Sequence, residues 1–313
     1  MKWLFGKSTK KGRASRIAIK PPVADPDRQG LALVTIAKNE EDKIADWLTF
    51  HAVAGGREII LYDNMSTDRT ADIARSFTGM DVTVIPWQLH TETCSPVLVL
   101  PRQILAYCHA LSTFGGRFRW MAMVDIDEYI VPKSKASIPE ALETLSGHAN
   151  ISLPWTMFGH NGHDMAPETP VPFAYTSRAK VSEGPLLSFK CIVDPSEVTK
   201  VSVHKFETAS MGRTSSNTLG RVAHNKRRKS SSFVTHDVLQ LNHYYLMSRE
   251  ETEAKLNRGA VSGVPIERRT ASVREKQDIM ENTAVSDKSA LEFLERHGIL
   301  TVDNFIHRTK GST

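Results

Sequence analysis

Two aspartates separated by a single residue, Asp125 and Asp127, are the first candidates in this sequence for binding a ligand. On extended backbone, side chains at positions i and i+2 point to the same side, so both carboxylates would face one point. Carboxylate oxygens suit Mg²⁺ and Mn²⁺, ions that a protein can share with the phosphates of a substrate. The pair therefore predicts a divalent metal site, although a solvated strand end or a helix cap would show the same spacing.

Two of the twelve histidines could complete such a site. His204 and His243 each lie in a short apolar segment that is typical of a strand. A neutral imidazole there can serve as a metal ligand. The alternative for either residue is a structural histidine held by hydrogen bonds.

Repeated units of strand, polar loop and helix must position these residues. Strands are predicted over residues 30–37, 58–62, 81–86 and 119–124, and helices over 41–53, 69–77 and 101–114. This order predicts an α/β fold in which helices cover both faces of a parallel sheet. Ligands of such sheets bind at the carboxyl ends of the strands. We therefore expect the polar segments 38–40, 63–68 and 125–128 to converge on one crevice.

Several classes of protein are excluded by composition and by missing motifs. Apolar residues make up 40% and charged residues 24% of the 313-residue chain, which is typical of a globular protein and excludes collagen and coiled coil. No apolar run is long enough for a transmembrane helix. Neither GxGxxG nor GxxxxGK[ST] follows a predicted strand, which argues against a dinucleotide-binding dehydrogenase and a P-loop NTPase. A nucleotide would have to be held by side chains and a metal.

Three cysteines without CxxC spacing favour a reducing compartment, and we expect a cytoplasmic location.

The positive charge is concentrated at the start of the chain. Residues 1–28 carry eight Lys or Arg against two Asp, whereas the net charge of the whole chain is +5. This composition predicts a basic, flexible tail. Its residues Trp3, Leu4 and Phe5, next to lysines, would suit a peripheral contact with an anionic membrane. The alternative is a solvated terminus that has no partner.

A second basic block runs from residue 208 to 236 and contains no acidic residue. Nucleic-acid binding would require aromatic residues between the basic ones, and these are lacking. We therefore expect no nucleic-acid partner, and interpret the block as a loop near an anionic substrate.

Taken in order, the motifs resemble the family-2-like and family-92-type glycosyltransferases of the GT-A fold. The resemblance covers roughly residues 30–260. The motifs that carry it are Ala37-Lys38-Asn39-Glu40, Trp47-Leu48-Thr49-Phe50-His51, Tyr62-Asp63-Asn64-Met65-Ser66-Thr67-Asp68, Val124-Asp125-Ile126-Asp127-Glu128-Tyr129, Trp155 with Phe158-Gly159 through Gly162-His163, and Asn242-His243-Tyr244-Tyr245 with Ser248, Glu250-Glu251, Lys255 and Arg258-Gly259. It implies a Rossmann-like α/β/α sandwich with a mostly parallel sheet over residues 29–250, between the tail of residues 1–28 and a helical extension over 251–313.

The resemblance also implies roles for individual residues. Asp127 would ligate Mn²⁺ or Mg²⁺, together with His243 and, with less support, His204. The residues that would bind the nucleotide-sugar donor are Lys38, Asn39, Glu40, Asp63, Asn64, Asp68, Arg102 and Asp125. The Glu-Asp pair that serves as catalytic base in family-2 enzymes is not found. The titratable residues in or next to the glycine-hinged loop 158–164, which would face the acceptor, are therefore the candidates: His163, Asp164 and Glu168.

The expected reaction is metal-dependent transfer of a hexose from a nucleotide diphosphate, by family habit UDP, to a hydroxyl group. The acceptor would be a glycan, a lipid-linked sugar or a growing polysaccharide. Two alternatives stay open: a protein that binds nucleotide sugar or polysaccharide without turnover, and a metal-dependent nucleotidyl or phosphoryl transferase. Release of nucleoside diphosphate separates the expected enzyme from both.

Overall fold

The strand β3, Leu31–Ala37, is nearly all buried and lies inside the largest sheet. The computed structural model describes residues 12–89, 98–180, 183–257 and 266–309. In it, β3 pairs in parallel with β4, Glu58–Asp63, and with β7, Trp120–Met123. The strand β5, Asp81–Pro86, extends the sheet in parallel beyond β4. These strands confirm the parallel half of the predicted sheet.

The sheet changes direction on the other side of β7. There β11, Phe189–Val193, pairs antiparallel with β7 and with β9, Asn150–Met157. The strand β16, Leu239–His243, lies parallel to β9 and antiparallel to β8, Glu128–Pro132. The sheet is therefore mixed: the expected run of parallel strands extends over β7, β3, β4 and β5, and the remaining strands combine parallel and antiparallel pairs. Beyond β9 it ends in β14, Thr214–Ser216, and β15, Val222–His224.

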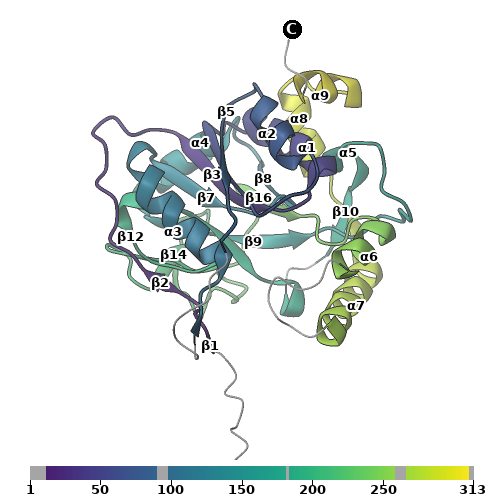
Figure 1. Cartoon of the computed structure of the whole chain (residues 1–313). Coiled ribbons are helices and arrows are strands. Elements are labelled where there is room, and N and C mark those ends of the chain that lie inside the picture. The colour runs from purple at the N-terminus through teal and green to yellow at the C-terminus, as the bar shows by residue number, and fades with distance from the viewer. Residues whose placement is uncertain (1–11, 90–97, 181–182, 258–265, 310–313) are drawn as a thin grey trace, which may run out of the picture.

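Alternation along β3 produces an apolar layer on each face of the sheet. Leu31 and Leu33 pack into the layer that contains α1, Glu41–Val53, whereas Ala32 and Val34 pack into the layer that contains α3, Arg102–Phe114. The helix α2, Thr70–Ser76, lies beside α1 (Figure 1). All three helices begin and end within one residue of the predicted bounds, so the predicted helices on both faces are confirmed.

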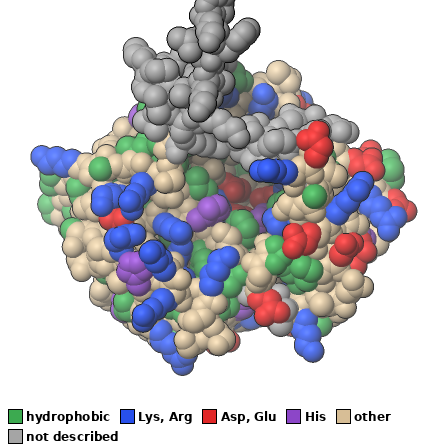
Figure 2. Space-filling model, turned by 90° about the horizontal axis from the view of Figure 1, so that it is seen from below, with side chains coloured by type: hydrophobic (Ala, Val, Ile, Leu, Met, Phe, Trp, Pro, Cys, Tyr) green, Lys and Arg blue, Asp and Glu red, His purple; other side chains and the backbone are tan. Residues whose placement is uncertain are grey.

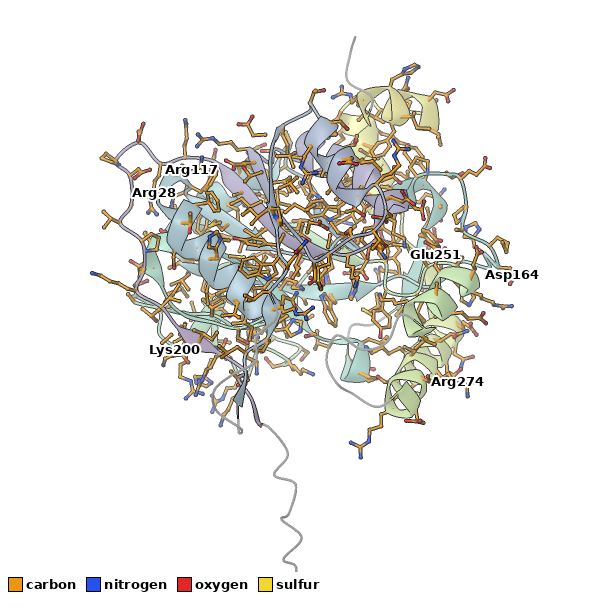
Figure 3. All side chains as sticks on the ribbon, in the orientation of Figure 1. Arg28, Arg117, Asp164, Lys200, Glu251 and Arg274 are labelled. Atoms are coloured by element: carbon orange, nitrogen blue, oxygen red, sulfur yellow. The ribbon has the colours of Figure 1, made fainter. Side chains whose placement is uncertain are left out.

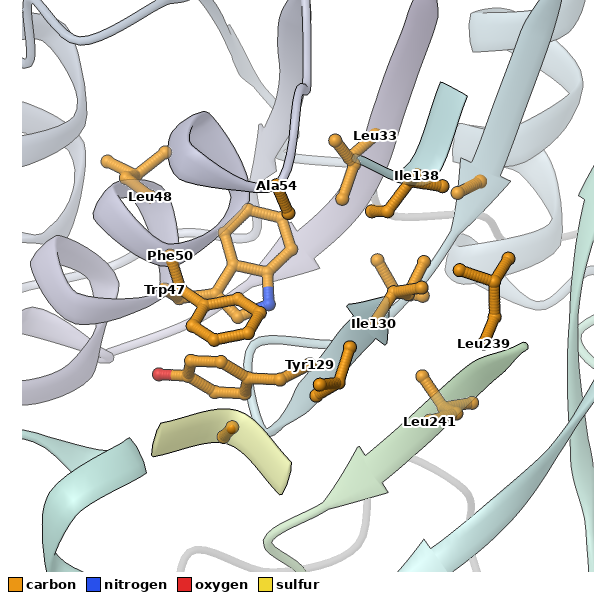
Figure 4. Close-up of a cluster of buried hydrophobic side chains, with 14 of the residues drawn as sticks. Leu33, Trp47, Leu48, Phe50, Ala54, Tyr129, Ile130, Ile138, Leu239 and Leu241 are labelled. Atoms are coloured by element: carbon orange, nitrogen blue, oxygen red, sulfur yellow. The ribbon is translucent and has the colours of Figure 1, made fainter. Parts of the chain in front are cut away.

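The larger core joins α1 to the C-terminal helices. Trp47 and Phe50 project from α1 toward Tyr129 of β8, and Ile130 and Leu241 continue the cluster (Figure 4). On the other side of Phe50 lies Phe293 of α8, Ser289–Arg296, with the ring centroids 5.3 Å apart. The C-terminal elements thus share the core of the sheet domain, so there is no break in packing at residue 250.

The remaining elements surround this sheet. The predicted tail is described from residue 12, where β1 pairs with β6, and β2 then pairs with β12. The proposed anchor Trp3-Leu4-Phe5 lies outside the described residues. The remaining strands and helices are β1 Gly12–Arg13, β2 Ile17–Ala18, β6 Leu98–Val99, β10 Ser177–Ala179, β12 Val198–Val201, β13 Glu207–Thr208, β17 Ala284–Ser286, α4 Ile138–Leu142, α5 Val171–Ala174, α6 Arg249–Asn257, α7 Ile266–Asn282 and α9 Val302–Thr309. Short 3₁₀ turns occur at Gly115–Arg117, Glu143–Leu145, Gly184–Leu186 and Pro195–Glu197. Among the described helices, none combines the length and the apolar composition that spanning a membrane requires.

Candidate active site

A cavity of about 380 Å³ lies where β3 and β7 end, a volume typical of a site for a small molecule. Its lining combines carboxylates, lysines, histidines and aromatic rings: Glu40, Lys43, Gln103, Asp125, Asp127, Trp155, His204, His243, Tyr245, Glu251 and Lys255 belong to it. The predicted crevice at the strand ends is thus present for the segments 38–40 and 125–128, whereas no residue of the segment 63–68 lines it. Figure 2 shows acidic side chains within a hollow of the surface, with Lys, Arg and His side chains grouped beside it.

Asp125 is held at the end of β7 by three contacts. Lys190 Nζ lies 2.7 Å from its Oδ2, and the Gln103 side chain donates to its Oδ1 at 2.9 Å. Its backbone N–H donates to the Glu128 carboxylate at 2.9 Å. The antiparallel pairing of Cys191 with Met123 brings Lys190 to this strand end. The orientation of Asp125 is therefore fixed by its surroundings.

Lys190 and Glu128 lie side by side with no exposure to solvent. Lys190 Nζ lies 3.4 Å from Glu128 Oε2, and Trp155 Nε1 donates to Glu128 Oε1 at 2.7 Å. Burial raises the pKa of Glu128, although the Lys190 ammonium opposes the rise. Burial alone would lower the pKa of Lys190, but Asp125 and Glu128 hold it well above its usual range. Lys190 is therefore a permanent positive charge behind the cavity wall.

Asp127 faces two partners from distant parts of the chain. Lys255 Nζ lies 2.8 Å from Oδ2, and His243 Nε2 lies 3.5 Å from Oδ1. The register of β16 against β8 pairs His243 with Glu128, which places the imidazole beside Asp127. Burial would raise the pKa of Asp127, but Lys255 and His243 hold it well below its usual range. Asp127 is therefore an anion at neutral pH.

The donor set of Asp127 and His243 fits a divalent ion that has other ligands as well. Burial lowers the pKa of His243 despite the attraction of Asp127, so its imidazole is neutral, as a metal ligand must be. Two ligands of one ion, each about 2.1 Å from it, lie roughly as far apart as these two atoms. In this structure the cation beside Asp127 is the Lys255 ammonium, so the carboxylate is placed to pair with a positive charge. No three His, Cys, Asp or Glu side chains in the described ranges are grouped to hold a metal, so substrate oxygens would complete the shell.

His204 also lines the cavity but contacts different groups. Its Nδ1–H donates to the Phe189 carbonyl at 3.0 Å, and its ring packs against Trp155. Burial and the nearby Lys190 charge lower its pKa to about 4. The structure thus brings His204 to the cavity wall as a neutral ring.

Most of the predicted donor-binding residues lie in the two loops that follow β3 and β4, and several of them link one loop to the other by hydrogen bonds. Asn39 accepts from the Thr67 N–H at 2.9 Å, and Asp68 accepts from the Glu41 N–H at 3.1 Å. Asp63 accepts from the Ser66 N–H, and Arg102 donates to Asn64 at 3.4 Å. Of the eight predicted donor-binding residues, Glu40 and Asp125 line the cavity, whereas Lys38 is exposed. The loops are therefore next to the cavity and brace each other.

The predicted base residues lie outside the cavity lining. His163 donates from Nε2 to the Ala174 carbonyl, and Asp164 pairs with Arg249 while its own side chain is 74% exposed. Glu168 is exposed as well. Figure 3 shows Asp164 at the outer edge of the molecule and Glu251 closer to the sheet. The loop instead supports α6, because Arg249 and Glu250 donate backbone hydrogen bonds to its carbonyls.

Helix α6 supplies cavity residues to which we had assigned no role. Ser248 and Glu251 form a capping box, since each side chain accepts from the backbone N–H of the other. This holds Glu251 at the helix start, where Lys43 lies 3.1 Å from it. One helical turn later, Lys255 reaches Asp127. The Ser-x-x-Glu spacing was a signal for this helix start, and the lysine inside the apolar run Phe189–Val193 was a signal for Lys190.

Comparisons with known proteins agree on one family. The family model described as glycosyltransferase family 92 matches residues 34–276. Two curated relatives, both named as glycosyltransferase family 92 proteins of Ricinus communis, are 21% identical over 182 residues and 23% identical over 168 residues. These matches cover 56% and 49% of this chain but 30% and 27% of the relatives, so the chain spans less than a third of their length. Since the family match extends over most of the sequence, the chain belongs to glycosyltransferase family 92.

Proposed function

We propose that this glycosyltransferase moves a hexose from a nucleotide diphosphate, with UDP as the first choice, to a hydroxyl of a glycan or lipid-linked acceptor. The observation that carries the proposal is that Asp125 and Asp127 share one cavity at the end of β7 with His243. The parallel strands β7, β3, β4 and β5 support assignment to the GT-A fold.

The cavity has the charges that a diphosphate leaving group requires. Lys43 and Lys255 line it, and the fully buried Lys190 lies behind Asp125. Positive groups fixed in place before the reaction stabilise developing negative charge at little cost in reorganisation. We therefore assign the lysine side of the cavity to the diphosphate.

Asp127 and His243 are the residues that would hold Mn²⁺ or Mg²⁺. When bound, the ion would supply Lewis-acid stabilisation of the leaving phosphate. His204 stands on the cavity wall as a further possible ligand. Asp125, fixed by Lys190 and Gln103, would accept hydrogen bonds from the donor's sugar or ribose hydroxyls.

If the transfer inverts the anomeric carbon, a base must take the proton of the acceptor hydroxyl. Besides the loop residues His163, Asp164 and Glu168, the geometry offers two further carboxylates that line the cavity, Glu40 and Glu251. A general base typically contributes about 10²–10⁴-fold to the rate. Five single variants, three Glu→Gln, one Asp→Asn and one His→Gln, would identify the base by a loss of that size at one position.

A donor screen tests the proposed reaction. The full chain would be incubated with Mn²⁺, a panel of nucleotide sugars and a mixture of glycan acceptors, and released nucleoside diphosphate would be measured. Release with at least one donor, increased by acceptor, is the expected result. Binding without release would show a binding protein, and pyrophosphate release would show a nucleotidyl transferase.

The unbridged thiols of Cys108 and Cys191 support the proposed cytoplasmic location.

A further inference from the structure

The hairpin β14–β15 and the turn after it present a strongly basic surface. Four exposed basic side chains define what we call the hairpin surface, together with Leu219 and Val222: Arg221, Lys226, Arg227 and Lys229. No acidic residue lies between residues 208 and 236. A hollow of about 860 Å³ lies within it, lined in part by Arg221, Lys226 and Arg227. This segment therefore adds only positive charge to the surface.

Two aliphatic side chains project from the same surface. Leu219 is 47% exposed and Val222 is 54% exposed, and they flank Arg221 in the sequence. Only three other large apolar side chains in the described part of the chain are this exposed: Val23, Met165 and Leu300. The sole aromatic residue of the segment, Phe233, is 2% exposed, so it presents no ring for stacking on a base.

The tip of the hairpin is built rigidly. The Asn217 side chain is fully buried and accepts from the backbone N–H groups of Leu219 and Arg221, both at 3.0 Å. Its amide nitrogen donates to the Phe233 carbonyl at 2.8 Å. Gly220 completes the turn with a φ of 77°. Leu219 is thus held outward by a preformed turn, and its exposure is part of the fold.

The hairpin surface is joined to the rim of the cavity. Arg228 is 2% exposed and donates to the His204 carbonyl at 2.8 Å and to Ser152 Oγ at 2.7 Å. His204 lines the cavity, and its neighbour Lys205 is exposed. The N-terminal segment adjoins the same region, because Arg16 of that segment contacts Glu207 at 3.1 Å. A partner bound at the hairpin surface would therefore lie beside the cavity.

We propose that the hairpin surface docks on an anionic lipid bilayer, with Leu219 and Val222 entering the interface and the four basic residues contacting lipid phosphates. Basic residues near an anionic membrane and aliphatic residues at its interface both favour binding. A soluble polyanion would use the charges but gain nothing from the exposed aliphatic pair. Docking there would bring the cavity rim to the membrane, where a lipid-linked acceptor is located.

Vesicle cosedimentation of the full chain tests the charges. Vesicles of phosphatidylcholine would be compared with vesicles that contain about 30 mol% phosphatidylglycerol. Removing the four charges with Arg221→Ser, Lys226→Ser, Arg227→Ser and Lys229→Ser should weaken binding to the anionic vesicles at least about tenfold. A control removes four exposed charges elsewhere with Arg75→Ser, Arg268→Ser, Arg274→Ser and Lys288→Ser, and should change binding far less. Equal loss in both variants, or no loss in the first, overturns the proposal.

The aliphatic pair separates a lipid partner from a soluble polyanion. The double variant Leu219→Ser and Val222→Ser should lose vesicle binding several-fold but keep the wild-type affinity for polyphosphate. The control Met165→Ser and Leu300→Ser removes two side chains of 66% and 68% exposure elsewhere, and should bind vesicles as the wild type does. Unchanged vesicle binding by the Leu219→Ser and Val222→Ser variant would show a site for polyanions and would overturn the assignment to lipid. Neither arm uses a sugar donor, so the outcome does not depend on the proposed reaction.

Discussion

Lys190 Nζ lies 2.7 Å from Asp125 Oδ2 although the Lys190 side chain has no exposure to solvent. A buried ammonium must be paired, and here Asp125 and Glu128 provide the pairing. The pair connects an interior strand, β11, to a cavity carboxylate at the end of β7. The shape of the cavity therefore depends on a charge that does not line it.

Replacing this lysine should be costly to the fold. Lys190→Met would leave two carboxylates beside an apolar side chain, so the free energy of unfolding should fall by about 3 kcal/mol. The control is Lys200→Met, whose half-exposed ammonium lies 2.7 Å from Glu207 and should contribute less than about 1 kcal/mol. Urea denaturation at neutral pH measures both. Equal stability of the two variants would show that Lys190 does not neutralise the buried acids.

Lys255 should compete with a metal ion for Asp127. Its ammonium lies 2.8 Å from Asp127 and 4.5 Å from the centre of the Tyr245 ring. Lys255→Met should therefore raise the affinity for Mn²⁺ alone by about threefold to tenfold, because a like charge is removed. Lys276 packs on the same ring at 4.3 Å, so Lys276→Met is the matched control. Calorimetric titration with Mn²⁺ measures the effect, and unchanged or weaker binding in Lys255→Met would contradict it.

His51 should make the fold sensitive to acid. Its Nδ1–H donates to the Trp47 carbonyl and its Nε2 accepts from the Ile130 N–H, so a second proton would oppose the Ile130 bond. Burial lowers the pKa of His51 to about 3. The unfolded imidazole binds a proton below about pH 6.5, so the unfolded state gains protons first and stability falls as the pH falls from there toward 3.

Urea denaturation at two pH values checks this prediction. Between about pH 6 and about pH 5, His51 should account for a loss of about 1 kcal/mol in the free energy of unfolding. His51→Gln should remove that part of the pH dependence. His297 makes the same bond to the carbonyl four residues earlier but is only half-buried, so His297→Gln should keep the wild-type slope. A wild-type slope in His51→Gln would refute the assignment.

The turn after α1 requires a glycine for reasons of space. A Cβ at Gly55 would lie 2.9 Å from Ser137 Cβ and 3.1 Å from Pro139 Cδ, at a φ of 88°. Gly162 has a similar φ of 81° but open space around it. Gly162→Ala should therefore cost about 1 kcal/mol, and Gly55→Ala about 2 kcal/mol more. Thermal unfolding of both variants measures the two losses of stability, and their difference is the contribution of the steric clash at Gly55. Equal losses would exclude the clash.

Local patterns were sufficient for the first half of the fold. The apolar runs of β3, β4 and β7 and the periodicity of α1 are properties of neighbouring residues, and the structure confirms them. The direction in which β11 pairs is set by contacts far along the chain, so the mixed half of the sheet could not be predicted. The helix α7, Ile266–Asn282, lies within the predicted helical extension over 251–313, but its bounds could not be predicted, because its charged sequence lacks a continuous apolar stripe.

In the site too, the features set by neighbouring residues could be predicted, and those set by contacts far along the chain could not. Asp125 and Asp127 were predicted because they follow a recognisable strand. His243 was placed by resemblance, and the structure explains its position through the register of β16 against β8. Lys190 and Lys255 reach the two aspartates from positions 65 and 128 residues away, a distance that no local pattern encodes.

Release of nucleoside diphosphate from a nucleotide-sugar donor, with and without Asp127, tests the central claim most directly. The wild-type chain in Mn²⁺ should release the diphosphate, and a chelator or Asp127→Asn should each reduce release at least about a hundredfold. Asp278→Asn, on an exposed position of α7, should leave release unchanged. Full activity of Asp127→Asn, or of the wild type in chelator, would contradict a metal-bound diphosphate at this aspartate.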